Sequence, residues 1–424
     1  MTTALTDEEA AALAAIDEAA LGRTLCDLVA VPSVTGTAAE SELQHVLAGH
    51  LERSGLDVDL WSMDLPDLRA HSDFPGGEAP RDEAWGLVGT SSGEGDTPAL
   101  VLQGHVDVVP PGDPRRWLAS PFTPRVVGDV VHGRGTCDMK AGVTAILGAL
   151  AAIRASGVRP RRRLAAHFVV SEEDGGLGAF GTLRRGHTGD ACVIAEPTSG
   201  ALMIANAGAL TFRIEVPGRA THGSTRWAGV SAIDAYLPLH AALARLEQRR
   251  NTGADPLMGD HPIPYPLSVG LLCAGDWASS VPDLLVAEGR LGVQLDEDPG
   301  HARVELEECV AEACAADSWL RDHPAVVTWS GGQFASGRLP GGHPLAQLVG
   351  GAHADLSGGS RPIERGAPYG SDLRLYSAAG VPTLQYGPGD VSLAHGPREQ
   401  VSLAEVLTVT RVLVLTALRA TGTR

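Results

Sequence analysis

The sequence predicts an α/β protein, with helices flanking a sheet, from three observations. Short apolar runs of strand length recur at 99–103, 164–171, 191–195 and 381–386, and such runs are typical of strands buried on both faces of a sheet. An Ala- and Leu-rich helical segment, 139–156, separates the first two runs, as in strand–helix–strand folds. The chain has 424 residues, more than one ordinary core accommodates, so two domains are expected.

Further elements are predicted toward the two ends of the chain. Apolar side chains recur at helical spacing over 40–53, which predicts a helix. The stretch 66–96 is rich in Pro, Gly and Asp and is expected to be a loop. A last helix is predicted over 402–418, where Ser402 and Glu405 have the spacing of a capping box.

The middle of the chain has a different pattern. Its predicted elements are an alternating strand at 210–218, a helix at 229–249, a strand at 284–295 and a helix at 301–316. Few strands and two helices suggest a small domain of its own, from about 205 to 330.

The composition limits the partners and the compartment. The formal net charge is −18, which argues against nucleic acid or an anionic membrane as a partner. The six cysteines form no CxxC pair, so reduced thiols and a cytoplasmic location are expected. The N-terminus lacks the pattern of a signal peptide, and no apolar run predicts a membrane-spanning helix.

Polar side chains follow the ends of the predicted strands. They are His105 and Asp107 after the first, Glu172 and Glu173 after the second, Glu196 after the third and His395 after the fourth, with Asp138 just before the Ala-rich helix. Open α/β sheets bind ligands at the carboxyl ends of their strands. The sequence therefore predicts one site that collects two histidines and several carboxylates.

These residue types point to metal ions. Carboxylates at close range repel one another unless a cation neutralises them. Histidine with carboxylate suits Zn²⁺ and its neighbours, whereas oxygen ligands alone would suit Ca²⁺ or Mg²⁺. Two histidines and three carboxylates exceed one tetrahedral site and fit two metals that share a carboxylate, roughly 3.5–4 Å apart.

Individual roles follow in part from spacing. Asp107 lies two residues after His105, on the same side of the strand, and can accept the second ring N–H of His105. Glu172 and Glu173 are adjacent and should point apart, so that one ligates a metal while the other acts as a base. A lone His-x-Asp pair or an Asp before a helix is commonly structural, and Cys137 looks like a packing residue. The joint pattern is what favours a site.

The same residues carry a resemblance to a known family. The segments GHVDVVP, GRGTCDMKAG, SEEDGG, AEPT and AHGPRE, in this order, resemble the M20 family of metallopeptidases, and within it the branch of acetylornithine deacetylase and succinyl-diaminopimelate desuccinylase. The resemblance implies a zinc-peptidase-like catalytic domain with a mixed central sheet, formed by 1–204 and 330–424. It also implies an inserted, smaller α+β lid or dimerisation domain, 205–329.

The resemblance also implies a role for each site residue. His105 and Glu196 would hold one zinc ion, Glu173 and His395 the other, and Asp138 would bridge them, with Co²⁺ as a possible substitute. Asp107 would orient His105, Glu172 would be the general base, and the Asp138–Met139 peptide would be cis.

The lid segment GRATHGSTRWAGVSAI contains His222, which resembles the family's lid histidine. It would stabilise the oxyanion, often in the site of a partner subunit, which implies a homodimer through the lid domain. The alternative is a histidine in a turn. Ser279 stands where many members have asparagine, and Arg290 is displaced by two residues from the family's strand-ending arginine.

Three residues are candidates for binding substrate: Arg290, Ser371 and Arg374. Guanidinium grips a carboxylate bidentately, although either arginine could instead be a surface ion-pair partner. Ser371 lies in YGSDLRLY, which resembles the family's Gly-Ser/Thr-Asp turn.

The predicted function is that of a cytoplasmic di-zinc amidohydrolase. It would cleave the amide bond of an N-acyl amino acid, as a deacetylase or desuccinylase does, through a metal-bridging hydroxide with Glu172 as base. A dipeptidase or carboxypeptidase of the same family is the alternative. A single-metal enzyme and a catalytically silent binding protein are further alternatives, and a small molecule or short peptide is the expected partner.

Overall fold

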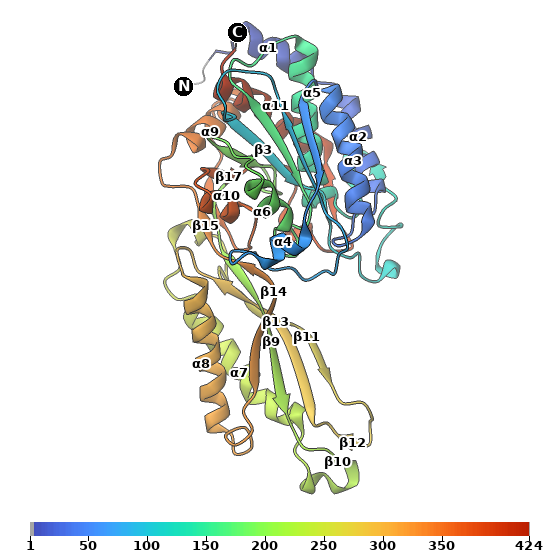
Figure 1. The fold of residues 1–424 in the computed structure, drawn as a ribbon, viewed down its shortest axis with the longest axis vertical. Helices are drawn as coiled ribbons and strands as arrows, with labels where there is room; N and C mark the ends of the chain where they lie inside the picture. The colour runs from blue at the N-terminus through green and yellow to red at the C-terminus, as the bar shows by residue number, and fades with distance from the viewer. Residues whose placement is uncertain (1–3, 424) are drawn as a thin grey trace.

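The computed structural model describes residues 4–423. The molecule is elongated, with a wide part that contains a large sheet and many helices, and a narrower part that extends from one end of it (Figure 1). Both ends of the described part of the chain lie on the wide part, at the end far from the narrow part.

The large sheet is mixed, as predicted. Its strand order is β1 (Asp57–Ser62), β2 (Trp85–Thr90), β6 (Leu164–Val169), β3 (Leu100–His105), β7 (Cys192–Ile194), β17 (Thr383–Gln385), β8 (Leu202–Asn206) and β15 (Gly337–Arg338), with β16 (Glu364–Ala367) also paired to β8. Strands β6, β3, β7 and β17 run parallel to one another, whereas β1, β2 and β15 pair antiparallel to their neighbours. The four parallel strands are those whose apolar runs the sequence displays.

Helices cover both faces of this sheet (Figure 1). On one face lie α2 (Glu18–Ala30), α3 (Ala38–Arg53), α5 (Ala141–Ser156), α9 (Pro344–Leu356) and α11 (Leu403–Thr421); on the other lie α6 (Leu177–Arg184) and α10 (Leu373–Ala378). Strand β3 is therefore buried on both sides. Leu100 and Leu102 pack in the same buried cluster as α5 and α11, whereas Val101 packs in a separate cluster with residues of α6 and α10. The predicted cap of α11 is present, since the Ser402 hydroxyl accepts the Glu405 backbone N–H at 3.3 Å.

Helix α5 is apolar on all sides because the core surrounds it. The helical stretch Thr136–Ser156 is long and apolar enough to cross a membrane by length and composition, but 83% of its apolar 18-residue window is buried inside the structure. It packs against α11 and α2, which accounts for its hydropathy.

The loop predicted over 66–96 is wrong in two places. Helix α4 (Leu65–Ala70) occupies the start of the stretch. Strand β2 lies within that stretch and is paired on both sides, to β1 and β6. Its glycines hide the strand pattern, and packing requires them. A side chain at Gly86 would meet the Trp61 ring at 2.1 Å, and one at Gly89 would meet Leu51 at 2.9 Å.

The narrow part is built on a second, antiparallel sheet. Its order is β11 (Leu267–Ala274), β13 (Leu284–Val293), β9 (Gly208–Pro217) and β14 (Val326–Phe334), with α7 (Ala232–Arg250) and α8 (Pro299–Ala316) packed on it around a buried cluster of their own. A short ribbon of β10 (Thr221–His222) and β12 (Ser280–Val281) forms its far tip (Figure 1). The sequence pattern missed β11 and β14, since β11 is largely exposed and β14 is irregular between Trp329 and Gln333.

The chain passes between the two sheets at two adjacent places. Strand β8 ends at Asn206 and β9 begins at Gly208, while β14 ends at Phe334 and β15 begins at Gly337. The two passages are paired, because Phe334 lies opposite Ala209 and Gly337 lies opposite Asn206. The division of the chain at 205–329 stays a prediction, and its boundaries fall inside β8 and β14.

Candidate metal centre

The predicted ligands lie together at the carboxyl ends of the parallel strands. His105 ends β3, and the others follow β6, β7 and β17 or precede α5. Asp138, Glu172, Glu173, Glu196 and His395 line one cavity of about 510 Å³, whose opposite wall comes from the second sheet and includes Arg290 and Phe334. The site therefore sits where the wide and narrow parts meet.

Asp138 lies at the centre of this cluster. Its Oδ1 is 3.0 Å from His105 Nε2, and its Oδ2 is 3.5 Å from His395 Nε2. Glu173 Oε2 is 3.1 Å from His395 Nε2, and Glu196 Oε2 is 3.8 Å from His105 Nε2. Each oxygen of Asp138 thus faces a different histidine, and each histidine has a glutamate beside it.

The charges of the cluster are unbalanced. Burial, reinforced by neighbouring carboxylates, raises the pKa of Glu172 and Glu196 well above their ordinary value. The carboxylate of Glu173 raises the pKa of His395 to about 11. Such shifts mean that the ionised carboxylates have too little positive charge beside them, and bound divalent cations would supply it. Two groups of three residues could each hold a metal ion, because within each group the ligand atoms lie within 4.8 Å of one another. The groups are His105, Asp138 and Glu173, and His105, Glu172 and Glu196. The donor set therefore fits metal ions.

Local packing brings the Asp138 segment against the strands. The Asp138–Met139 peptide is cis, as the family resemblance implies. Helix α5 begins two residues later, and its Gly142 lies so close to the end of β7 that a Cβ there would be 2.0 Å from the Ala195 carbonyl oxygen. This glycine lets Asp138 approach Glu196.

Asp107 has contacts that the sequence did not predict. The ring Nδ1 of His105 is 3.0 Å from the backbone carbonyl of Asp107, whereas the Asp107 carboxylate is 3.6 Å away. That carboxylate instead accepts the backbone N–H groups of Glu172 and Glu173 at 3.1 and 3.2 Å, and the Thr35 hydroxyl at 2.9 Å. Asp107 therefore orders the turn that presents both glutamates, and its main chain orients His105.

The preceding residue, Ser171, has a left-handed backbone, with φ of 61°. Two carboxylates hold it there. Glu40 accepts its backbone N–H at 3.1 Å, and Asp174 accepts its hydroxyl. The buried Arg81 donates to Glu40 at 3.2 Å, which ties this turn to α3. Sequence reasoning missed Glu40 and Arg81, because nothing local marks them.

Glu399 and Arg134 form a buried ion pair behind the site. Glu399 Oε1 accepts the backbone N–H groups of Cys137 and Asp138 at 3.0 and 3.2 Å, and Arg134 donates to the His395 carbonyl at 3.1 Å. Burial raises the pKa of Glu399 to about 7. The pair thus fixes the backbone at two predicted ligands. Sequence reasoning missed Glu399, although it is the last residue of AHGPRE, one of the segments that carry the family resemblance.

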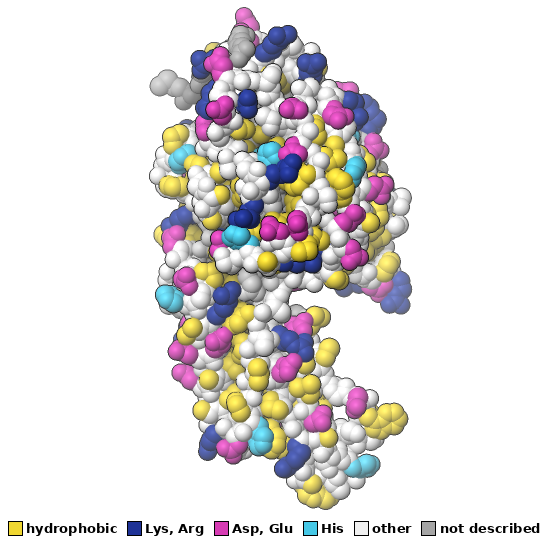
Figure 2. Space-filling view, in the orientation of Figure 1, with side chains coloured by type: hydrophobic (Ala, Val, Ile, Leu, Met, Phe, Trp, Pro, Cys, Tyr) yellow, Lys and Arg dark blue, Asp and Glu magenta, His cyan; other side chains and the backbone are white. Residues whose placement is uncertain are grey.

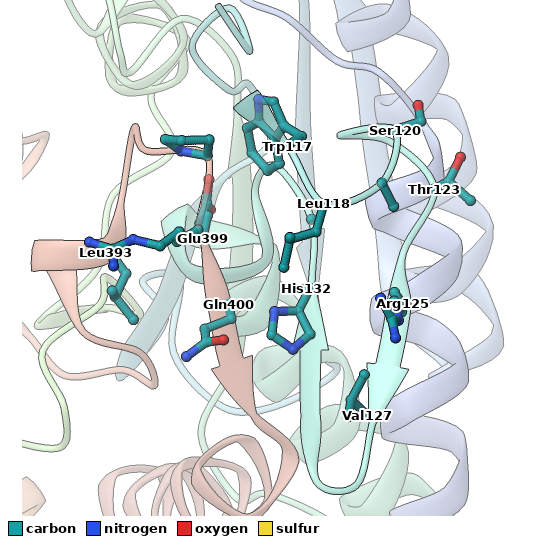
Figure 3. A pocket seen from close by; sticks show the side chains of 14 residues that line it. Trp117, Leu118, Ser120, Thr123, Arg125, Val127, His132, Leu393, Glu399 and Gln400 are labelled. Carbon is teal, nitrogen blue, oxygen red and sulfur yellow. The ribbon is translucent and has the colours of Figure 1, made fainter. Parts of the chain in front are cut away.

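The far side of this pair borders a second cavity, of about 480 Å³, lined by Trp117, Leu118, His132, Gln400 and others (Figure 3). The Arg134 guanidinium lies 5.1 Å from the Trp117 ring centroid. Glu399 therefore separates this cavity from the candidate metal centre.

The remaining candidates are placed unequally. Arg290 lines the site cavity, and its Nη2 is 3.4 Å from the Pro368 carbonyl oxygen. Ser371 and Arg374 lie behind the wall: the Ser371 hydroxyl accepts from Gln385, and Arg374 donates to the carbonyls of Ser371 and Gly175. Neither residue lines the site cavity, and their polar atoms hold the loop, so a role in binding substrate stays a prediction.

His222 is not part of the cluster. It is exposed on β10, at the far tip of the narrow part (Figure 1). Its ring Nδ1 is 2.7 Å from the Ser224 hydroxyl of the same turn. Within one chain, this structure does not bring His222 to the carboxylates.

A mixed sheet flanked by helices, with a histidine–carboxylate cluster at the carboxyl ends of its parallel strands, is the arrangement of a metal-dependent hydrolase. Residues 101–419 match peptidase family M20/M25/M40, and the chain belongs to this family.

Its relatives include several activities. The chain is 26% identical over 394 residues to N-formyl-4-amino-5-aminomethyl-2-methylpyrimidine deformylase of Bacillus subtilis (88% of this chain, 87% of the relative). It is 29% identical over 396 residues to succinyl-diaminopimelate desuccinylase of Stenotrophomonas maltophilia (90% and 94%). The fold matches the YxeP protein of Bacillus subtilis, described as a dinuclear metal-binding peptidase of family M20, with a TM-score of 0.62, 16% identity and coverage of 96% and 99%.

Proposed function

We propose that the chain is a di-zinc amidohydrolase that removes a small acyl group from the nitrogen of an N-acyl amino acid. One observation carries the proposal: the two oxygens of Asp138 face two different histidines, at 3.0 and 3.5 Å. A carboxylate so placed is suited to bridging two cations. The deformylase and desuccinylase relatives support an acyl group as the part that is released.

Each ligand has a place in this proposal. His105 and Glu196 would hold one ion, Glu173 and His395 the other, and Asp138 both. Two such ions would supply polarisation of the scissile carbonyl and a lowered pKa for the attacking water. Arg290, whose Nε has no hydrogen-bond partner among the described residues, would bind a carboxylate of the substrate.

Glu172 moves the proton. Its carboxylate takes a proton from the attacking water, whose oxygen adds to the carbonyl carbon. When the C–N bond breaks, Glu172 passes that proton to the leaving nitrogen, so that an amide and water become a carboxylic acid and an amine. The Asp107 carboxylate holds the backbone of Glu172 at 3.1 Å and so keeps this base in place.

Removal of metal tests this function. We expect the purified chain to hold two metal ions, to lose turnover after treatment with a chelator and to regain it with Zn²⁺ or Co²⁺. Metal analysis should be combined with a panel of N-formyl, N-acetyl and N-succinyl amino acids and unblocked dipeptides. Hydrolysis of only the dipeptides would identify the alternative, a peptidase, which the M20 peptidase fold also supports. One metal per chain at full activity would contradict the paired site.

A homodimer through the narrow part would give His222 a role. Figure 2 shows hydrophobic side chains exposed on that part. Ile233 and Leu237 are 43% and 60% exposed on one face of α7, and Leu271 and Leu272 are 63% and 55% exposed on the edge strand β11. Exposed apolar groups on an edge strand invite pairing with another chain. In such a dimer, the partner subunit's His222 would donate to the oxyanion.

Mixed dimers test this arrangement. Glu172→Gln and His222→Ala are each expected to be inactive alone. Co-expressed, they should regain roughly a quarter of the wild-type rate, because half of the random dimers then contain one intact site of two. Recovery of no activity, with mixed dimers verified by differential tags, would place His222 in its own chain's site. A wild-type rate in His222→Ala alone would place it outside catalysis.

The cytoplasmic location remains a proposal. All six cysteines, including the exposed Cys273, are free thiols in the structure, which supports a reducing compartment.

A further inference from the structure

Tyr369 lines the site cavity, with its hydroxyl unused. It lies between β16 and α10, and the same cavity is lined by Asp138, Glu172 and Glu196. The hydroxyl is buried and has no hydrogen-bond partner among residues 4–423. Burying a hydroxyl without a partner is unfavourable, and such groups call for an explanation. A partner that arrives with the substrate would provide one.

The loop that carries Tyr369 is clamped from three sides. Arg290 Nη2 is 3.4 Å from the carbonyl of Pro368, the residue just before it. Two residues later, the Ser371 carbonyl accepts from Arg374 at 2.8 Å, and the Ser371 hydroxyl accepts from Gln385 at 2.6 Å. The backbone on both sides of Tyr369 is therefore held in place. A donor held in position before the reaction is what electrostatic catalysis requires.

The hydroxyl keeps its proton. Burial raises the pKa of Tyr369 well above the ordinary value of tyrosine, and the charges of Glu196 and Asp138 raise it further. Tyr369 is therefore a hydrogen-bond donor and not a base, which leaves proton transfer to Glu172.

We propose that Tyr369 is a catalytic residue that donates a hydrogen bond to the carbonyl oxygen of the substrate as that oxygen becomes negatively charged. This inference rests on the proposed amide hydrolysis. Water adds to the carbonyl carbon, its proton goes to Glu172, and the carbonyl π-electron pair moves onto the carbonyl oxygen, which would accept the hydrogen bond from Tyr369. Tyr369 neither gains nor loses a proton. Each site would then have a donor from its own chain, in addition to any supplied by a partner.

The test is Tyr369→Phe, which removes only the hydroxyl. We expect kcat to fall by about 10²-fold, the effect of losing one such donor, with KM within about twofold of wild type. The metal content should not change. A second readout is the binding of methylphosphonate, which mimics the tetrahedral intermediate. The zinc-loaded variant should bind it at least about tenfold more weakly than the zinc-loaded wild type does, whereas the two proteins should bind planar acetate equally well.

Tyr386→Phe is the matched control. Tyr386 is also a buried tyrosine, but its hydroxyl lies 2.8 Å from His353 Nδ1, outside the site. This variant should retain wild-type kcat, KM and methylphosphonate affinity.

Three outcomes would overturn the inference. An unchanged kcat would show that the hydroxyl is idle, and a change confined to KM would assign it to substrate binding in the ground state. Loss of metal would assign it to holding a ligand such as Glu196. Failure of the proposed function is separable, because the wild-type chain would then hydrolyse no amide in the panel. Methylphosphonate binding measured by calorimetry would still compare the two tyrosine variants.

Discussion

Replacing Glu172 with glutamine is expected to lower kcat by about 10³-fold while both metal ions stay bound. Glutamine has nearly the same shape but cannot accept the proton of the attacking water at this position. The Glu172 backbone N–H would still bind Asp107, at 3.1 Å, so the turn should keep its geometry. Steady-state kinetics and metal analysis on the same preparation measure both parts of the expectation.

The adjacent glutamate provides the control. Glu173 is 3.1 Å from His395, and Glu173→Ala should lower the metal content instead of leaving it intact. A wild-type rate in Glu172→Gln would show that Glu172 is not the base. Loss of metal in that variant would make Glu172 a ligand, a role that its proximity to His105 and Glu196 also permits.

Glu399→Gln should weaken both the fold and the metal centre. The variant leaves the Arg134 guanidinium buried without its counter-charge, and breaking a buried pair in this way lowers the free energy of unfolding by about 3 kcal/mol. It also disturbs the acceptor that holds the backbone at Asp138, so metal affinity should fall by about 10- to 100-fold. Denaturant unfolding of the metal-free protein and a metal titration measure the two effects.

A second buried pair separates the two effects. Arg250 in the narrow part is buried and donates to Glu297 at 2.6 Å and also to Glu305, and none of the three residues lines the cavity of the candidate metal centre. Glu297→Gln should lower stability but leave metal affinity unchanged. Should Glu399→Gln behave in the same way, the Arg134–Glu399 pair would be structural only.

The positions of the predicted ligands in the fold follow a simple rule. Each apolar run is a strand, each strand ends in a polar residue, and parallel strands end at one edge. The contacts of Asp107 were not predictable in this way. Whether a ring nitrogen meets a carbonyl at 3.0 Å or a carboxylate at 3.6 Å depends on the exact path of the chain after β3.

The parts missed by sequence reasoning depend on long-range packing. Strand β2 was assigned to a loop because Gly86 and Gly89 look like breakers, yet they are needed under Trp61 and Leu51. Glu399 and Asp138 are 261 residues apart, so no local pattern shows that one holds the backbone of the other. The contacts of Arg374 also depend on distant segments, since its guanidinium lies 3.9 Å from the Phe334 ring centroid and donates to the Ser371 carbonyl.

The paired passages of the chain between the two sheets have an evolutionary consequence. Seen from the large sheet, everything between Asn206 and Gly337 is a single excursion whose ends return to neighbouring positions. The entropy of closing such an excursion rises only slowly with its length. All five predicted metal ligands lie outside it, whereas Arg290 and Phe334, on the opposite wall of the cavity, lie within it. Substitutions within this excursion can therefore change the cavity wall that carries Arg290 and Phe334 without altering the predicted ligands on the large sheet. A family with one metal centre can diversify its substrates in this way.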